Sequence, residues 1–312
     1  MLRKLVRYSY TILLAGLNFL EGNLLSKSKP KYPVIFIIGP PRSGTTLLYQ
    51  LMTHYFHMAY FFSMSDLFFT APVLMSKIFK PLLRPYQSDF QSNYGKVRGF
   101  NSPQEGRIWR RWFPTDWNAS YHYVGPSYLS TQEKMEIRAT IANIEKIYNA
   151  PFINKNVYNS VRIRALVDIF PSSLFLQLKR DPIQIALSIL EGRKKSKDIN
   201  QWWSVMPREI NQLRYKSHIE QIAGQVYYIE KNIEEDMEIV GVDRFYIVSY
   251  KRLCKAPQAE LQSIKLFLTS KGVPLRTKYD IPTSFRYYRV DESIFTEEQY
   301  ALAEQVKAYY RS

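Results

Sequence analysis

The sequence is poor in cysteine, histidine and acidic residues, and each shortage narrows the class of protein. Its one cysteine, Cys254, can form neither an internal disulfide bond nor a thiolate metal cage, so nothing requires an oxidising compartment. The four histidines show no metal-ligand spacing, and we expect no metal site. Lysine and arginine number 43 against 27 aspartates and glutamates, and the net charge of +16 favours an anionic partner. Such a partner is a nucleotide, a nucleic acid, a membrane surface or a sulfated or phosphorylated substrate.

A long hydrophobic run is also missing. Residues 8–25 are largely apolar, but Asn18, Glu21 and Asn23 interrupt them before the roughly 18 continuous apolar residues of a membrane span are reached. No small-residue cleavage pattern follows. The spacing predicts an amphipathic helix that packs on the domain, lies on a membrane surface or is a degenerate signal anchor. Its apolar face holds Tyr10, Leu13, Leu14, Leu17, Leu20 and Leu24. We expect residues 1–30 to be this helix and a linker, and residues 31–312 to be one domain.

A strand, a glycine-bearing turn and a helix are predicted over residues 34–52. Residues 34–38 are apolar and β-branched, as in a buried parallel strand, and residues 47–52 have helical spacing. The turn between them reads Gly-Pro-Pro-Arg-Ser-Gly-Thr-Thr, a context in which backbone N–H groups cradle a phosphate. Its spacing matches the ATP-type loop G-x-x-x-x-G-K-[ST], except that Thr45 stands where that loop has lysine. The turn therefore suits a shorter anionic group than a triphosphate, with Arg42 supplying the charge.

A second strand–helix junction follows about 135 residues later. Residues 172–179 predict another buried strand, preceded by a helical run over residues 157–170. Asp181 is suited to cap the next helix and Pro182 to begin it. Arg180 ends the strand and Ser188 lies eight residues further on. An arginine fork and a hydroxyl suit a phosphate dianion, although a capped helix start alone also explains Arg-Asp-Pro.

Together the two junctions resemble the donor-binding motifs of the PAPS-dependent sulfotransferase superfamily, in its bacterial and carbohydrate- or tyrosyl-protein-modifying branches. PAPS is 3′-phosphoadenosine 5′-phosphosulfate. Residues 41–46 fit the family pattern P-[KR]-S-G-T-[ST] without a mismatch. The resemblance implies PAPS as sulfate donor, adenosine 3′,5′-bisphosphate as product and no metal. It implies that the 3′-phosphate is held by Arg180 and Ser188, and that the 5′-phosphosulfate is held by Arg42, Ser43, Gly44, Thr45 and Thr46.

Two further segments resemble the family more weakly. Residues 250–268 resemble its Y-E-x-L … P … FL segment, which implies that Tyr250 contacts the nucleotide, although Lys251 replaces the acidic residue. Residues 284–289 lie where the family places basic residues that close over the nucleotide, which makes Arg286 and Arg289 candidates.

Sulfuryl transfer needs a base for the acceptor and a cation for the leaving phosphate. Residues 101–109 resemble the family's P-x-E-[DE] stretch and imply Glu105 as general base, although the second acidic residue is Gly106. Residues 153–157 resemble its L-K-[ST]-P element and imply that Lys155, together with Arg42, stabilises the leaving group. The alternative bases are His54, His57 and Asp66.

The order of the expected elements predicts an α/β fold with a P-loop-type parallel sheet flanked by helices, and no linker or repeat divides it. Residues 55–128 form an irregular, aromatic-rich insertion, which either contributes to the core or lines an acceptor pocket. The predicted function is sulfuryl transfer from PAPS to a hydroxyl or amine of a carbohydrate, a lipid or another acceptor. The alternatives are a P-loop kinase or NTPase, or a non-catalytic basic protein that binds membranes or nucleic acid. We expect a cytoplasmic protein with no nucleic-acid partner, with peripheral membrane contact through residues 1–25 as an option.

Overall fold

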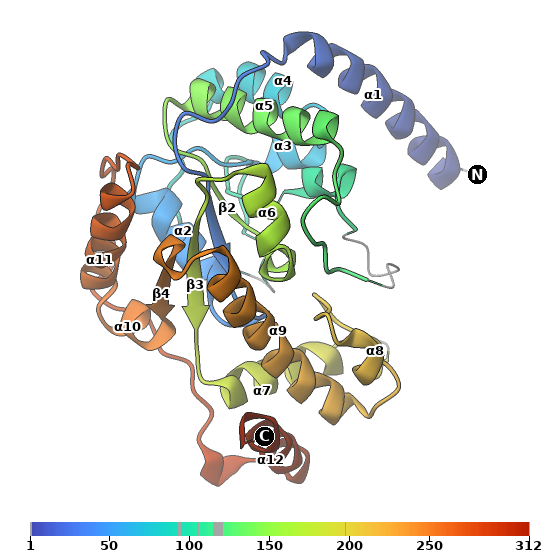
Figure 1. Cartoon of the computed structure of the whole chain (residues 1–312), viewed down its shortest axis with the longest axis vertical. Coiled ribbons are helices and arrows are strands. Elements are labelled where there is room, and N and C mark those ends of the chain that lie inside the picture. The colour runs from blue at the N-terminus through green and yellow to red at the C-terminus, as the bar shows by residue number, and fades with distance from the viewer. Residues whose placement is uncertain are drawn as a thin grey trace.

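The central sheet is parallel, as predicted (Figure 1). The computed structural model describes residues 2–92, 95, 97–104, 106–114, 121–196 and 198–311, with side chains from residue 10 onward. Within these residues, four strands pair in the order β2-β1-β3-β4, each parallel to its neighbour. The strands are β1 (Ile35–Ile38), β2 (Ile153–Lys155), β3 (Leu174–Lys179) and β4 (Phe245–Ser249).

Both faces of the sheet are covered, which explains why β1 is apolar along its length and β3 is mainly apolar. All four residues of β1 are buried. Phe175 of β3 stacks on Phe36 of β1 and on Phe245 of β4, with ring centroids 5.8 and 4.8 Å apart. These rings tie the three strands together on one face of the sheet.

The strand order places a topological switch point between β1 and β3. The chain leaves β1 through α2 (Thr45–Tyr55) towards β2, and returns from β2 through α6 (Ile163–Ile169) to β3 on the other side of β1. Right-handed crossovers in opposite directions put these helices on opposite faces. Figure 1 shows α6 and α9 (His218–Val240) in front of the sheet. Open parallel sheets bind ligands at the carboxyl ends of strands beside such a switch point.

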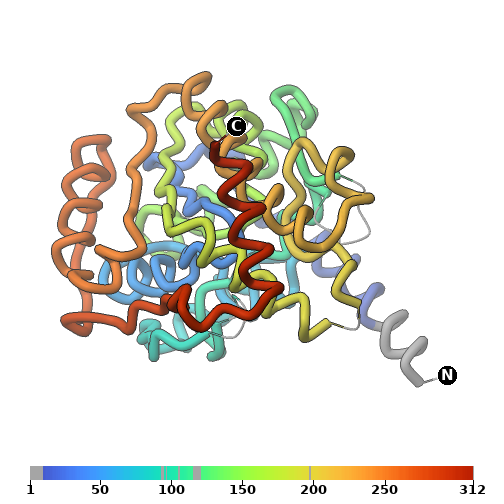
Figure 2. Tube along the Cα trace, turned by 90° about the horizontal axis from the view of Figure 1, so that it is seen from below, coloured from blue at the N-terminus to red at the C-terminus, as the bar shows by residue number. Residues whose placement is uncertain are grey.

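The remaining helices surround this sheet. The predicted cap of α7 (Pro182–Lys194) is confirmed, because the side chain of Asp181 accepts hydrogen bonds from the backbone N–H groups of Ile183 and Gln184. At the start of α12 (Glu297–Arg311), Thr296 and Gln299 exchange hydrogen bonds. Figure 2 shows α12 across the lower face, where it packs against α7 and α9. The helices are α5 (Thr131–Tyr148), α7 (Pro182–Lys194), α8 (Ile210–Leu213), α10 (Tyr250–Lys255), α11 (Pro257–Ser270) and α12 (Glu297–Arg311), with short 3₁₀ helices η3 (Val157–Val161), η4 (Val242–Arg244) and η5 (Glu292–Ile294).

The aromatic-rich insertion contributes mainly to the core. It contains α3 (Ser63–Leu67), α4 (Pro72–Phe79), η1 (Lys80–Leu82) and η2 (Arg107–Arg111). The indole N–H of Trp109 donates to Asn154 Oδ1 of β2 at 3.0 Å, which fixes the insertion beside the sheet. The buried aromatic residues of the insertion include Phe61, Phe62, Trp109, Trp112 and Phe113.

The N-terminal helix α1 (Leu2–Leu24) packs on α4 and projects from the body (Figure 1). The buried carboxylate of Glu21 accepts from the backbone N–H groups of Val73 at 2.9 Å and Leu74 at 2.8 Å, so it caps α4 from outside. Elsewhere on α1, large apolar side chains are exposed, among them Ile12, Leu13, Phe19 and Leu20. None of the helices in the described ranges has the length and apolar character needed to cross a membrane.

Candidate active site at the carboxyl ends of the strands

The turn after β1 has the geometry of an anion-binding loop. Arg42 and Gly44 have φ angles of +70° and +106°, and Gly44 is the N-cap of α2. Left-handed residues in such a turn direct backbone N–H groups into a concavity that binds anions. The hydroxyl of Ser160 accepts from the N–H of Gly39 and donates to its carbonyl, both at 3.0 Å, and so anchors the start of the turn. Residues 39–46 therefore have a backbone shape suited to an anion, and they are called the phosphate loop below after their predicted role.

The second predicted motif lies directly against this phosphate loop. Arg180 Nη1 donates to the carbonyl of Arg42 at 2.9 Å, across 138 residues of sequence. Arg42 Nε in turn donates to Ser188 Oγ at 3.0 Å. The two motifs thus form one cluster at the ends of neighbouring strands β1 and β3. Arg42 and Ser188 touch, although the resemblance assigns them to opposite ends of the nucleotide.

Tyr250 packs between the phosphate loop and Arg180. The guanidinium of Arg180 lies 4.6 Å from the centroid of its ring. A Cβ built on Gly44 would lie only 2.4 Å from Tyr250 Cδ2, so the ring sits against the backbone of the phosphate loop. Burial raises the pKa of the Tyr250 hydroxyl to about 12, which keeps it protonated. Tyr250 therefore supports the shape of the loop.

Residues 285–290 cross the same end of the molecule as an extended strap. The N–H of Phe285 donates to the carbonyl of Cys254 at 2.7 Å. At the other end of the strap, the side chain of Gln184 accepts from the N–H of Val290 at 2.7 Å and donates to its carbonyl at 3.0 Å. Figure 1 shows the chain running here from the side of α10 towards α12.

The two arginines predicted to close over the nucleotide lie on this strap. Arg286 and Arg289 are both exposed, and the guanidinium of Arg286 lies 4.8 Å from the ring centroid of Tyr288. Arg180 Nη2 donates to the carbonyl of Tyr288 at 2.8 Å. The strap is therefore tied to the phosphate loop through Arg180.

Sequence patterns did not identify two supporting residues, Ser160 and Gln184. Both side chains are buried, and both form hydrogen bonds to backbone groups: Ser160 to Gly39 of the phosphate loop and Gln184 to Val290 of the strap. Neither belongs to a spaced motif. The available signal was a polar residue on the buried side of a helical segment, which is common in ordinary cores as well.

Lys155 ends β2 at the same edge of the sheet. It lies opposite Ile37 of β1, two residues before the phosphate loop, and its side chain is 2% exposed. Glu105, the predicted base, lies outside the described residues. The residue before it, Gln104, is held by two hydrogen bonds. Its N–H donates to the carbonyl of Phe61 at 2.8 Å, and its carbonyl accepts from the hydroxyl of Tyr49 on α2 at 3.3 Å.

The alternative bases are engaged elsewhere. His54 Nδ1 accepts from a backbone N–H at 3.0 Å, and its Nε2 donates to a backbone carbonyl at 2.9 Å. His57 Nε2 donates to another carbonyl at 2.8 Å. Burial lowers the pKa of both rings, and both follow or end α2, far from its start at the phosphate loop. Asp66 forms an ion pair with Arg107 at 3.3 Å. These contacts are structural ones.

Unpaired polar atoms at the phosphate loop fit an anionic ligand. Ser43 Oγ and Arg180 Nε are buried and have no hydrogen-bond partner among the described residues. Thr45 and Thr46 begin α2, where backbone N–H groups lack partners within the helix. Since buried polar atoms in folded proteins nearly always have a partner, this cluster is suited to receive oxygens from a ligand. The part of the chain that the structure describes contains no group of three His, Cys, Asp or Glu residues able to hold a metal ion.

Residues 33–271 match the sulfotransferase family, and the chain therefore belongs to that family. This confirms the resemblance carried by the two motifs. Omega-hydroxy-beta-dihydromenaquinone-9 sulfotransferase Stf3 is 22% identical over 254 residues, both in Mycobacterium bovis and in Mycobacterium tuberculosis. Each match covers 74% of this chain and 61% of the relative, so the chain spans less than two thirds of these relatives.

Several solved sulfotransferases are similar at low identity. STF1 from Mycobacterium tuberculosis H37Rv is 13% identical with a TM-score of 0.47, and the match covers 90% of this chain and 76% of the STF1 chain. STF9 from Mycobacterium avium is 14% identical with a TM-score of 0.45, and the match covers 89% of this chain and 69% of the STF9 chain. The sulfotransferase domain from the curacin biosynthetic pathway is 15% identical with a TM-score of 0.42, and covers 89% and 98%.

Proposed function

We propose that this protein is a sulfotransferase that moves the sulfuryl group of PAPS to a hydroxyl or amine of an acceptor molecule. One observation carries the proposal. Two motifs typical of PAPS-binding proteins, far apart in the sequence, meet through the bonds of Arg180 to Arg42 and of Arg42 to Ser188. A capped helix start without a nucleotide-binding role would not need this contact.

The phosphate loop would hold the 5′-phosphosulfate through Arg42, Ser43 and the N–H groups at the start of α2. Arg180 and Ser188 would hold the 3′-phosphate, since a planar guanidinium donates two parallel hydrogen bonds to a phosphate. The buried, unpaired atoms Ser43 Oγ and Arg180 Nε support both assignments. The exposed guanidinium groups of Arg286 and Arg289 on the strap would close over the nucleotide.

PAPS, when bound, supplies the sulfuryl group on a phosphate that is already a good leaving group. The chain has to provide a base and cations. Glu105 would take the proton of the acceptor hydroxyl as its oxygen bonds to sulfur. Lys155 and Arg42 would neutralise the charge that collects on the departing phosphate. The buried position of Lys155 at the end of β2 supports its role, because a cation acts more strongly where water is excluded.

A hydroxyl-bearing lipid is the acceptor that we favour over a carbohydrate. The name of the Stf3 relatives refers to an omega-hydroxylated dihydromenaquinone. The exposed apolar side chains of Ile12, Leu13, Phe19 and Leu20 on α1 support peripheral contact with a membrane, where such an acceptor dissolves. We accordingly propose that the protein lies at the cytoplasmic surface of a membrane.

A thermal-shift titration with adenosine 3′,5′-bisphosphate, without divalent metal, tests the proposal. Ligand at a hundred times its dissociation constant stabilises a protein by about 2.7 kcal/mol, and a hundredfold weaker affinity leaves about 0.4 kcal/mol. We expect the larger shift for the wild type and the smaller one for Arg180→Ala.

Arg138→Ala is the matched control, because Arg138 also donates from a half-buried position to two backbone carbonyls, at 2.6 and 3.3 Å, but on α5. It should lower the melting temperature and leave the nucleotide shift intact. A wild type that responds to MgATP and not to the bisphosphate would instead indicate a P-loop kinase or NTPase. A salt-sensitive affinity for anionic vesicles or DNA, unaffected by Arg180→Ala, would indicate a non-catalytic basic protein.

A further inference from the structure

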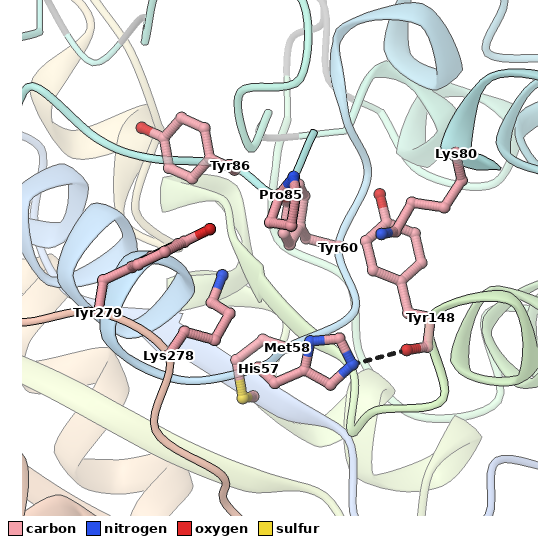
Figure 3. A pocket seen from close by; sticks show the side chains of 9 residues that line it. All are labelled: His57, Met58, Tyr60, Lys80, Pro85, Tyr86, Tyr148, Lys278 and Tyr279. Atoms are coloured by element: carbon pink, nitrogen blue, oxygen red, sulfur yellow. Dashed lines mark hydrogen bonds between the residues drawn. The ribbon is translucent and has the colours of Figure 1, made fainter. Parts of the chain in front are cut away.

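A pocket of about 240 Å³, shown in Figure 3, is lined by residues outside the phosphate loop. Four segments that are distant in sequence meet there: the residues after α2, η1 with the residues that follow it, the end of α5 and the residues after α11. The proposed sulfuryl transfer makes no use of it.

Helix α2 separates this pocket from the phosphate loop. The phosphate loop leads into the start of α2, whereas Lys278, which lines the pocket, binds the end of α2. The side-chain Nζ of Lys278 donates to the carbonyl of Thr53, and the backbone N–H of Lys278 donates to the carbonyl of Tyr55, both at 2.7 Å. A helix of 11 residues is about 16 Å long. The pocket is therefore not a part of the donor site.

Two ammonium groups face this pocket without a carboxylate. Lys80 Nζ lies 4.8 Å from the ring centroid of Tyr148, and Lys278 Nζ lies 5.4 Å from that of Tyr279. Figure 3 shows the two lysines on opposite sides of the pocket. Neither forms an ion pair within the described ranges. Burial lowers the pKa of Lys80, and burial together with the charge of Lys80 lowers that of Lys278 to about 8. The pocket thus concentrates positive charge that a bound anion would offset.

The other side chains of the pocket offer a hydrogen-bond donor and flat apolar walls. Tyr148 is 4% exposed, and its hydroxyl has no hydrogen-bond partner in the described part of the chain. Burial raises its pKa, so the hydroxyl keeps its proton and can donate it to an oxygen. Met58, Pro85 and the ring of Tyr60 complete the walls. An isolated inorganic ion would leave these apolar surfaces unused.

We propose that this pocket binds an oxyanion carried on a ring or a short apolar body, with Lys80 and Lys278 holding the charge and Tyr148 donating a hydrogen bond. Its volume is slightly below the roughly 300–1,000 Å³ of most ligand pockets. It therefore fits a small aromatic phosphate, sulfate or carboxylate, or the phosphate head of a lipid. The inference is independent of the proposed sulfuryl transfer.

Calorimetric titration of the full chain with phenyl phosphate, and with phenol as the matched neutral probe, tests the inference. We expect phenyl phosphate to bind and phenol to bind at least about tenfold more weakly, since a hydrogen bond to a charged group corresponds to roughly a 10- to 100-fold change in affinity. Lys80→Met should weaken phenyl phosphate by that factor. Lys77→Met replaces an exposed lysine on the preceding helix, α4, and should leave the affinity unchanged.

The melting temperature of Lys80→Met separates loss of binding from loss of folding. Removal of an unpaired, half-buried charge should leave the melting temperature unchanged or raise it. Absence of phenyl phosphate binding in the wild type overturns the proposal. So does binding that survives Lys80→Met, as it would if the probe occupied only the phosphate loop.

Vesicles distinguish a soluble ligand from a lipid. Phosphatidylcholine vesicles that contain phosphatidylglycerol should displace phenyl phosphate from the wild type if the natural ligand is a lipid phosphate, and vesicles of phosphatidylcholine alone should not. Displacement assigns the lipid head group to the pocket, and retention of phenyl phosphate assigns a soluble anion to it.

Discussion

Replacing Gly44 by alanine should destabilise the protein in two separable ways. The φ angle of +106° is one that a residue with a Cβ rarely adopts, and such strain costs about 1–3 kcal/mol. The added Cβ would also lie 2.4 Å from Tyr250 Cδ2, well inside ordinary contact, and forced repacking of this kind costs about 1–3 kcal/mol. We expect Gly44→Ala to lower the free energy of unfolding by about 2–6 kcal/mol.

A double-mutant cycle with Tyr250→Val separates the two contributions. Without the ring, only the backbone strain remains, so Gly44→Ala should cost about 1–3 kcal/mol less than it does in the wild type. Gly272→Ala is the control, because Gly272 has a φ of +82° and no atom within 4 Å of an added Cβ. It should cost the same in both backgrounds. Urea unfolding measures each free energy. If Gly44→Ala cost the same with and without the ring, Tyr250 would not pack on the phosphate loop.

Three other perturbations address the base, the N-terminal helix and the pH dependence. Glu105→Gln should lower the rate of sulfuryl transfer by about 10²–10⁴-fold without changing the affinity for adenosine 3′,5′-bisphosphate, and an unchanged rate would exclude Glu105 as the base. Glu21→Ala removes the acceptor of two buried N–H groups of α4 and should cost about 1–3 kcal/mol in urea unfolding, whereas an unchanged midpoint would refute the cap. Burial raises the pKa of Glu145 from 4.5 to about 7. Between pH 4.5 and pH 7 the folded state therefore keeps a proton that the unfolded state has lost. The free energy of unfolding should fall as the pH rises through this range, by at most about 3 kcal/mol. Glu145→Gln should remove that fall, and unfolding curves whose pH dependence survived the substitution would contradict its assignment.

Elements with strong local signals could be predicted from the sequence. The apolar run at residues 34–38 contains β1, and residues 172–179 contain β3, because buried parallel strands consist mainly of apolar residues. Asp181 and Pro182 define the start of α7 through chemistry within one turn. The phosphate loop and the Arg180 motif were predicted because their residues, too, are close together in the sequence.

Contacts between distant segments could not be predicted in this way. The single helix expected over residues 157–170 is divided at Arg162 into η3 and α6. There the buried guanidinium of Arg162 donates to the carbonyls of His122 and Pro114 and lies 4.9 Å from the ring centroid of Phe113. These tertiary contacts outweigh the helical spacing of the sequence. Likewise, Glu21 looked like an interruption of an apolar run, and only its position against α4 reveals a cap.

The same holds within the site. Spacing indicated that Arg42 and Arg180 both bind phosphate, but it gave no sign that the backbone of one accepts from the side chain of the other. Such a contact depends on the order of strands in the sheet, and the spacing of motifs along the sequence does not reveal that β1 and β3 are neighbours.

The most direct test of the central claim compares adenosine 3′,5′-bisphosphate with adenosine 5′-monophosphate by calorimetry on the wild type and on Arg180→Ala. The claim is that two motifs form one nucleotide site, with Arg180 at the 3′-phosphate. We expect the wild type to bind the bisphosphate much more tightly. Arg180→Ala should lower the affinity for the bisphosphate by a much larger factor than the affinity for the monophosphate. Equal affinities in the wild type, or an equal loss for both nucleotides in the variant, would contradict it.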